Sequence, residues 1–164
     1  MTTTTTQHPA IDAQTKWLLT QVHATAFIVA WFFCVVVSIL VARYTRVPRN
    51  GILNPQFWFQ THRILNYLAL GLMLIGLLTI FIAHQWRWLG PVVGGDRNSS
   101  STAWHTLFGI LSIGLAVIQP LNSFIRCDPS HQQRPIFNWI HRSIGAFCVA
   151  VCSRLHFDSL PFIH

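Results

Sequence analysis

Long apolar segments without formal charge dominate the chain. No Lys, Arg, Asp or Glu occurs in residues 17–42, 64–86 or 98–125, and each of these segments is longer than the ~20 residues that a helix needs to cross the hydrocarbon core of a bilayer. A fourth segment has an apolar centre and carries Arg142 and Arg154 near its ends, from which long basic side chains can reach the interface. The pattern predicts membrane-spanning helices over residues 17–43, 57–85, 102–126 and 136–157.

Stretches rich in Pro, Gly, Asn and Ser separate the four segments. Because short connections favour antiparallel neighbours, the predicted fold class is all-α, an integral membrane four-helix bundle with up-down-up-down topology. We expect residues 1–16 to form a disordered Thr-rich tail, residues 17–157 the transmembrane domain and residues 158–164 a short tail. The first residues contain neither a cationic nor an apolar region, so we expect no cleavable signal peptide.

Composition agrees with a membrane protein and excludes other classes. The chain has 11 Lys and Arg against 4 acidic residues, so charged residues make up 9% of 164 residues, where a soluble domain has about 25%. That is too little charge to cover the surface of a soluble protein. The basic residues form neither a run nor a continuous helix face, which argues against nucleic acid as a partner. The first predicted partner is the lipid bilayer.

The distribution of basic residues predicts the orientation of the helices. The side that holds the first and third loops receives seven of them: Arg43, Arg46, Arg49, Arg63, Arg126, Arg134 and Arg142. The other side receives four: Lys16, Arg87, Arg97 and Arg154. Since basic residues are enriched on the cytoplasmic side, we expect loops one and three to be cytoplasmic and both termini to be extracytoplasmic. The membrane is either the plasma membrane or an endomembrane.

Four histidines occupy equivalent places in the four predicted helices. His23, His62, His105 and His141 each lie a few residues inside the start of a span. Helices one and three run in the same direction, so their histidines share one depth, and those of helices two and four share the opposite depth. In a square antiparallel bundle these are the two diagonals. Each diagonal therefore offers two imidazoles facing each other, which is the arrangement of a haem iron with two axial histidines.

Small residues beside two of these histidines provide room for a flat ring. Gly109 and Gly145 each follow a histidine by four residues and so lie one turn away on the same helix face; helices one and two have Phe27 and Asn66 at this position. Helix packing through small residues is the alternative interpretation. Two haems placed this way would lie roughly 15–20 Å apart, and iron with two axial ligands favours electron transfer over oxygen binding.

Several short motifs resemble the cytochrome b561 family, in particular its ferric-chelate reductase branch, over about residues 23–145. They are Val41-Ala42-Arg43-Tyr44, Trp58-Phe59-Gln60-Thr61-His62-Arg63, Gln119-Pro120-Leu121 and Phe137-Asn138-Trp139-Ile140-His141. The resemblance implies two haem b groups per chain, with His23 paired with His105 and His62 paired with His141. It also implies a transmembrane ferric reductase-type oxidoreductase that moves electrons from a cytosolic, ascorbate-like donor to an outside acceptor such as a ferric chelate.

Basic residues next to the inner pair are candidates for contact with the donor or the haem propionates. Arg63 and Arg142 each directly follow an inner histidine, and cationic side chains attract anions. The positive-inside signal and contact with anionic headgroups explain the same residues without a ligand.

The chain also differs from the family pattern. Ala24 stands where the family usually has Gly, and the branch typically has a reeler or DOMON domain and at least one further helix, so we interpret the chain as a truncated member. One alternative is a non-catalytic or degenerate membrane regulator, or a partner subunit, that retains the bundle. A transporter of divalent metal is disfavoured because no carboxylate lies inside a span. The sequence leaves a homodimer open.

Overall fold

The computed structural model describes residues 11–45, 56–124 and 131–159. In these ranges the regular elements are helices, in the order α1 (Ala13–Ile28), the π-helix η1 (Val29–Val35), α2 (Val36–Tyr44), α3 (Phe57–Ala83), α4 (Ser101–Phe124) and α5 (Arg134–Ser159). Four stretches are long and apolar enough to cross a membrane, namely Ala13–Tyr44, Phe57–Ala83, Ser101–Ser123 and Arg134–Ser153. The predicted fold class, an all-α bundle of four membrane-spanning helices, is confirmed.

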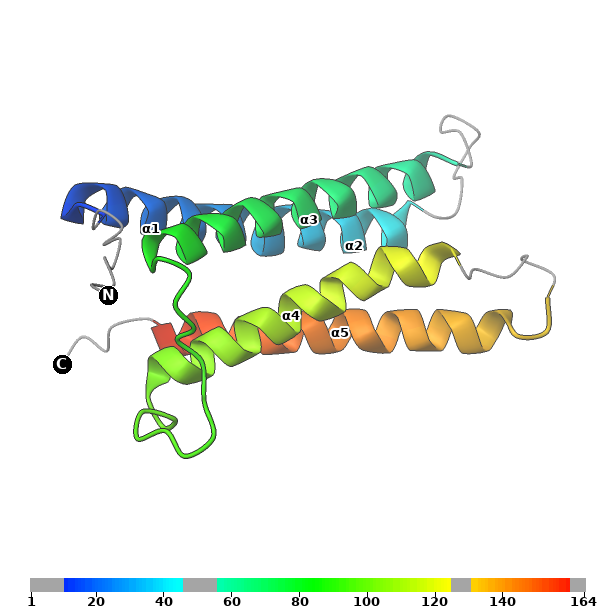
Figure 1. The fold of residues 1–164 in the computed structure, drawn as a ribbon. Helices are drawn as coiled ribbons and strands as arrows, with labels where there is room; N and C mark the ends of the chain where they lie inside the picture. The colour runs from blue at the N-terminus through cyan, green and yellow to red at the C-terminus, as the bar shows by residue number, and fades with distance from the viewer. Residues whose placement is uncertain (1–10, 46–55, 125–130, 160–164) are drawn as a thin grey trace, which may run out of the picture.

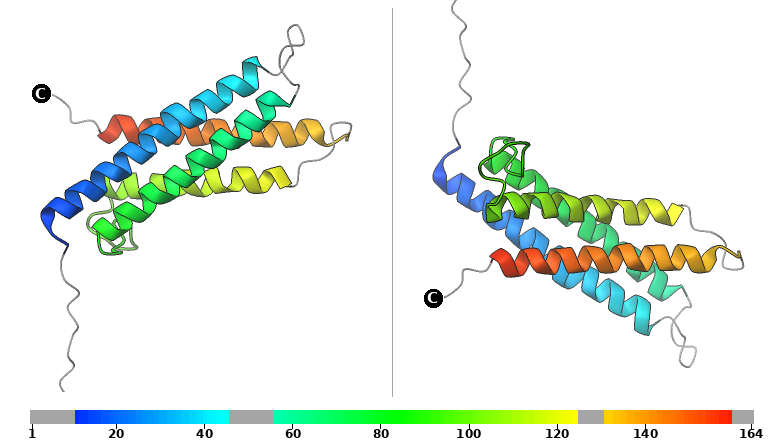
Figure 2. Two further views of the ribbon diagram at one scale, coloured as in Figure 1. Left: turned by 90° about the horizontal axis from the view of Figure 1, so that it is seen from above. Right: turned by 90° about the horizontal axis from the view of Figure 1, so that it is seen from below.

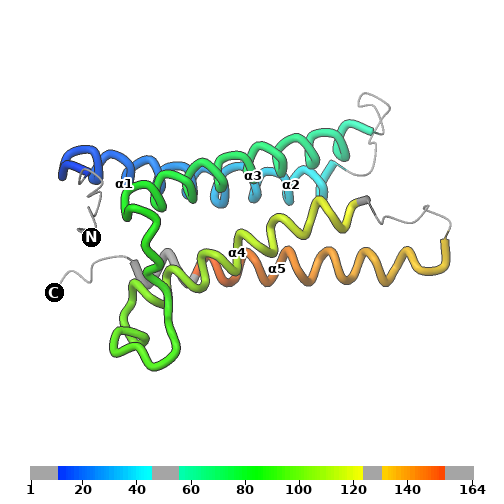
Figure 3. The backbone as a smooth tube through the Cα atoms, viewed as in Figure 1, coloured from blue at the N-terminus to red at the C-terminus, as the bar shows by residue number. Residues whose placement is uncertain are grey.

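The bundle consists of two helical hairpins. The first span, made of α1, η1 and α2, packs along α3, and α4 packs along α5, whereas α3 touches α4 only slightly. Figure 1 shows the first hairpin lying over the second, and the two further views show them crossing (Figure 2). The backbone passes from one hairpin to the other through residues 84–100 (Figure 3). The helices therefore approach one another less closely between the hairpins than within each hairpin.

The first span begins four residues before its predicted start. Asp12 caps α1, accepting hydrogen bonds from the Thr15 backbone N–H at 2.8 Å and the Thr15 hydroxyl at 2.6 Å. These bonds, the side-chain one first, lower the pKa of the Asp12 carboxyl because they stabilise its ionised form. Residues 13–16 thus belong to the helix and not to the predicted tail. The rest of that tail up to residue 10, and residues 160–164, lie outside the described residues.

The remaining helix ends also have local causes. Helix α3 ends at Ala83, two residues before the prediction, because Gln85 and Trp86 adopt positive φ angles of 53° and 60°. Trp86 then stacks on Phe81 with ring centroids 5.6 Å apart. Helix α4 begins at Ser101, where the Ser100 hydroxyl accepts the Ala103 backbone N–H at 3.2 Å. Helix α5 begins at Arg134, two residues before its predicted start.

The packed core lies at the middle of the bundle and is built mainly from small residues. Its fully buried members are Ala30, Trp31, Cys34, Ala69, Met73 and Cys148. They come from η1, α3 and α5, so the core joins the two hairpins. Small residues allow helices to approach closely where lipid supplies no hydrophobic driving force. Trp31 lies in the π-helical turn with 6% of its surface exposed.

Large apolar side chains cover the outside of the bundle. They include Leu18, Phe33, Leu68, Ile75 and Phe147, each about half exposed. Such a surface suits contact with lipid and would be unusual for a soluble protein. The protein is a multi-pass integral membrane protein.

Candidate functional site

The structure brings the four predicted histidines together as the two predicted pairs. The ring of His23 on α1 lies 6.3 Å from the ring of His105 on α4, measured between centroids, at an interplanar angle of 66°. The ring of His62 on α3 lies 6.3 Å from that of His141 on α5, at 68°. Each pair thus joins one hairpin to the other. The starts of α1 and α4 lie at one end of the bundle, and the starts of α3 and α5 lie at the opposite end (Figure 1).

The separation within each pair matches two imidazoles bound to opposite sides of one metal atom. A bond between a first-row metal and an imidazole nitrogen is about 2 Å long, and the ring centroid lies about 1 Å beyond that nitrogen, so trans ligands place their centroids about 6 Å apart. The angle between the rings is free, because each ring can rotate about its bond to the metal. The observed 6.3 Å satisfies this requirement in both pairs.

We name the pairs after the orientation predicted from the basic residues: the outer pair is His23 and His105, and the inner pair is His62 and His141. In the outer pair, the orientation of His23 is fixed by α3. Its Nδ1 lies 2.9 Å from the backbone carbonyl oxygen of Gly76. Since a carbonyl oxygen can only accept, Nδ1 carries the hydrogen and donates it, which leaves Nε2 with a free lone pair. Phe27, one turn along α1, packs on the His23 ring at a centroid distance of 4.8 Å.

In the inner pair, polar side chains contact both histidines. His62 Nδ1 lies 2.8 Å from the Ser38 hydroxyl and 3.1 Å from the Ser38 carbonyl oxygen. His141 stacks on Phe137, with centroids 6.1 Å apart and planes within 8°. Its backbone carbonyl accepts a hydrogen bond from Gln119 Nε2 at 3.0 Å. The inner pair is therefore surrounded by more polar groups than the outer pair.

The two glycines predicted to leave room for a flat ring, Gly109 and Gly145, have different surroundings. A Cβ added to Gly109 would meet nothing within 4 Å, whereas one added to Gly145 would lie 3.5 Å from Gln119 Nε2. Gly109, one turn beyond His105, therefore borders open space. The amide of Gln119 covers Gly145.

These observations fit haem better than a bare metal ion. Within the described ranges no group of three or more His, Cys, Asp or Glu side chains could hold a metal ion, so each histidine pair offers two ligands. Haem supplies the four remaining nitrogen ligands from its own macrocycle. The pairs lie between the hairpins, where the helices approach one another less closely than within each hairpin, and space is open beside Gly109.

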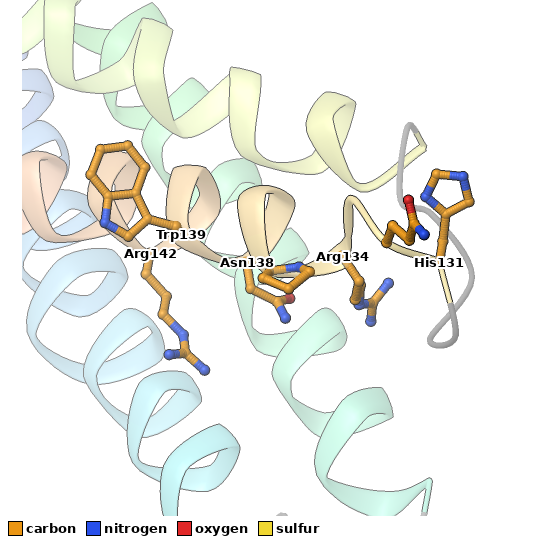
Figure 4. A pocket seen from close by; sticks show the side chains of 7 residues that line it. His131, Arg134, Asn138, Trp139 and Arg142 are labelled. Atoms are coloured by element: carbon orange, nitrogen blue, oxygen red, sulfur yellow. The ribbon is translucent and has the colours of Figure 1, made fainter.

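The predicted basic residues occupy different places. Arg142 lines an open cavity of about 520 Å³ at the start of α5, together with His131, Gln132, Arg134, Pro135, Asn138 and Trp139 (Figure 4). Arg63 is not among the lining residues; its guanidinium lies 5.7 Å from the centroid of the Phe59 ring. Only one of the two candidate arginines thus contributes to the cavity.

His84 follows α3 at the outer end and is outside both pairs. Partial burial lowers the pKa of His84, and repulsion from Lys16 and His23 lowers it further.

Three of the arginines counted on the side of loops one and three lie outside the described residues, namely Arg46, Arg49 and Arg126.

Comparison with known proteins decides the family. The family model of eukaryotic cytochrome b561 matches residues 13–156, which include both histidine pairs. The chain belongs to the cytochrome b561 family. This membership implies haem b and electron transfer within a membrane.

The cytochrome b561 chain also resembles longer curated proteins. It is 32% identical to ferric-chelate reductase 1 of Homo sapiens over 148 residues, which cover 88% of this chain and 23% of that protein. It is 29% identical to ferric-chelate reductase 1 of Mus musculus, covering 87% and 23%. It is 25% identical to a cytochrome b561 and DOMON domain-containing protein of Arabidopsis thaliana, covering 82% and 26%. The chain thus spans about a quarter of the length of these relatives. No solved structure matches.

Two residues that contact the ligands were missed by the sequence reasoning. Ser38 is the one Ser, Thr, Asn or Gln in residues 26–42, and an isolated polar residue in a membrane span is a signal for a hydrogen-bonded site. Gly76 shows no comparable signal, because its contribution is a backbone carbonyl.

Proposed function

We propose that the protein is a transmembrane di-haem b-type cytochrome. It carries electrons from a cytosolic, ascorbate-like donor to an acceptor outside, such as a ferric chelate. His23 and His105 would hold the outer haem, and His62 and His141 would hold the inner haem. The observation that carries the proposal is the presence of two cross-hairpin imidazole pairs, each with centroids 6.3 Å apart.

The spacing of the pairs suits transfer across the membrane. Gly76, whose carbonyl contacts His23, follows His62 on α3 by 14 residues, which corresponds to about 21 Å along a helix. This is slightly beyond the range expected from sequence and a large part of the ~30 Å hydrocarbon thickness. Bound haem supplies an iron that gains and loses one electron.

The chain's own residues hold the ligands and shape the donor side. His23 and His62 each donate from Nδ1 to a backbone carbonyl or to Ser38, which keeps Nε2 available for iron. Arg134, Asn138 and Arg142 are spaced four apart on α5, and their side chains point to one side of the helix (Figure 4). These three side chains form a polar row that ends at Arg142, the residue after His141. Such a row suits a small anion.

Proteoliposomes test this function directly. The haem-loaded chain is reconstituted with ascorbate trapped inside, and a ferric chelate with a dye for ferrous iron is added outside. We expect ferrous iron to appear outside faster than in protein-free liposomes that contain the same ascorbate. Haem-replete protein that gives no more ferrous iron than these liposomes would contradict the proposal and favour the non-catalytic regulator.

Replacing Arg142 by alanine tests the donor side. Loss of a charged hydrogen bond costs about 1.5–3 kcal/mol, so we expect the ascorbate concentration for half-maximal haem reduction to rise roughly tenfold or more. The haem spectrum should stay unchanged, because Arg142 is exposed and is not a ligand. Arg97→Ala removes the same charge from the opposite side and is the matched control. Equal kinetics for the two variants would place the donor elsewhere.

A further inference from the structure

Three polar residues meet beside the inner pair, where α2 lies against α3. Ser38, with no exposed surface, approaches His62 through both its hydroxyl and its carbonyl oxygen. Asn66, one turn beyond His62, donates from Nδ2 to the Ser38 hydroxyl. Nδ2 also donates to the His62 carbonyl oxygen at 2.6 Å. Asn66 is the residue that stands where the third and fourth helices have the glycine after the histidine.

The hydrogen-bonding capacities in this cluster allow one consistent assignment. The Ser38 carbonyl oxygen, 3.1 Å from His62 Nδ1, can only accept, so Nδ1 carries the hydrogen. The Ser38 hydroxyl then accepts from Nδ1 and from Asn66, and donates to the His62 carbonyl oxygen at 3.2 Å. Its single hydrogen and both lone pairs are used, and His62 Nε2 is left free to bind a metal.

Among the residues that the structure describes, no equivalent cluster surrounds His23. His23 Nδ1 bonds to the Gly76 carbonyl oxygen, which also accepts the Thr79 hydroxyl at 2.9 Å. That carbonyl belongs to the backbone and survives side-chain substitution. His62 Nδ1 also has a backbone acceptor, the Ser38 carbonyl oxygen, but in addition it contacts the Ser38 hydroxyl, which Asn66 contacts in turn. These two side chains can be removed by mutation, so the two sites differ in a way that an experiment can separate.

We propose that Ser38 and Asn66 are positioning residues for His62, and that they set its ring orientation and the redox potential of the inner haem. The inference rests on the proposed function, because it concerns the ligand of a bound haem. A hydrogen bond accepted from Nδ1 makes the imidazole a stronger electron donor through Nε2. This favours the ferric state and lowers the potential of the inner haem. Ser38→Ala leaves the Ser38 carbonyl oxygen as an acceptor of the Nδ1 hydrogen and removes the hydroxyl, so the hydrogen bonding of Nδ1 weakens and that potential should rise.

The test compares three variants of the full haem-loaded chain. Ser38→Ala removes the hydroxyl, and Asn66→Ala removes its donor while leaving Ser38 in place, which provides a second route if the first variant folds poorly. Ser112→Ala is the matched control, since Ser112 is an equally buried serine on α4 whose hydroxyl has no hydrogen-bond partner among the described residues. The readouts are the potentials of the two haems, their low-spin electron paramagnetic resonance signals, and the rate of haem loss to a scavenging apoprotein.

We expect Ser38→Ala to move one potential upward, and we expect both Ser38→Ala and Asn66→Ala to shift one of the two resonance signals and to speed the loss of one haem about tenfold. The other haem and the Ser112→Ala protein should match the parent. If the parent protein binds two haems and the Ser38→Ala and Asn66→Ala variants give the same readouts as Ser112→Ala, the inference is overturned. Equal changes in the potentials of both haems would overturn it too, because they indicate a general loosening of the helical bundle. A parent chain without haem would instead refute the proposed function.

Discussion

Replacing His62 by alanine should remove the inner haem and leave the outer one in place. The substitution deletes one of the two rings that face each other at 6.3 Å, and a single imidazole from His141 cannot supply both axial ligands. The outer ligand His23 is held by Gly76, about 21 Å away along α3, so its pair should persist. We expect the purified variant to bind one haem per chain and to show a single low-spin signal.

His84→Ala is the matched control, because it removes the histidine that directly follows the same helix and lies outside both pairs. It should keep two haems. Circular dichroism and gel filtration in detergent establish that both variants remain folded. A folded His62→Ala protein that keeps two haems, or one that loses both, would show that the pairs are assigned wrongly.

Adding one methyl group at Gly76 should disturb the outer site selectively. A Cβ there would lie 2.8 Å from two carbons of the Phe27 ring and 3.3 Å from the Ala26 Cβ. Phe27 in turn packs on His23, so its displacement is passed to the ligand. Overpacking of this kind costs about 1–3 kcal/mol. We expect Gly76→Ala to lower the thermal midpoint in detergent and to speed loss of the outer haem while sparing the inner one.

Gly71→Ala separates this clash from the general effect of adding a methyl group to α3. A Cβ at Gly71 meets nothing within 4 Å, and alanine favours a helix over glycine by up to about 1 kcal/mol. This variant should be at least as stable as the parent and keep both haems. If Gly76→Ala behaves in the same way, Phe27 does not hold His23 in place.

The arrangement of the spans was predictable because it depends on properties carried by the sequence itself. Three charge-free lengths and a fourth apolar segment with arginines near its ends indicated four crossings, and alternating direction predicted the pairing of His23 with His105 and of His62 with His141. The ring distances agree with that pairing. Antiparallel topology is a strong constraint in a membrane, where every helix must cross the same thickness.

Local backbone geometry was less predictable. The start of α1 depends on Asp12 as a cap, and the end of α3 depends on two consecutive residues with positive φ. Neither the cap nor the positive φ angles can be predicted from the hydropathy of the sequence. The π-helical turn Val29–Val35 lies in a uniformly apolar stretch, where periodicity cannot distinguish one helix type from another.

The residues that surround the paired histidines could not be predicted from the sequence. Arg63 and Arg142 are equivalent in sequence, each next to an inner histidine, yet only Arg142 lines the cavity on α5. In the sequence, Asn66 only stands at the position where the third and fourth helices have a glycine. Its role depends on its contact with Ser38 on another helix. Contacts between residues distant in the chain depend on the rotation of each helix, which a single sequence does not specify.

Haem quantified per chain, together with the reduced-minus-oxidised spectrum, tests the central claim most directly. The full chain is expressed with adequate haem, purified in mild detergent and assayed for haem, protein and absorbance. The two imidazole pairs predict two b-type haems per chain, both six-coordinate and low-spin. Folded protein that carries no haem would contradict the account.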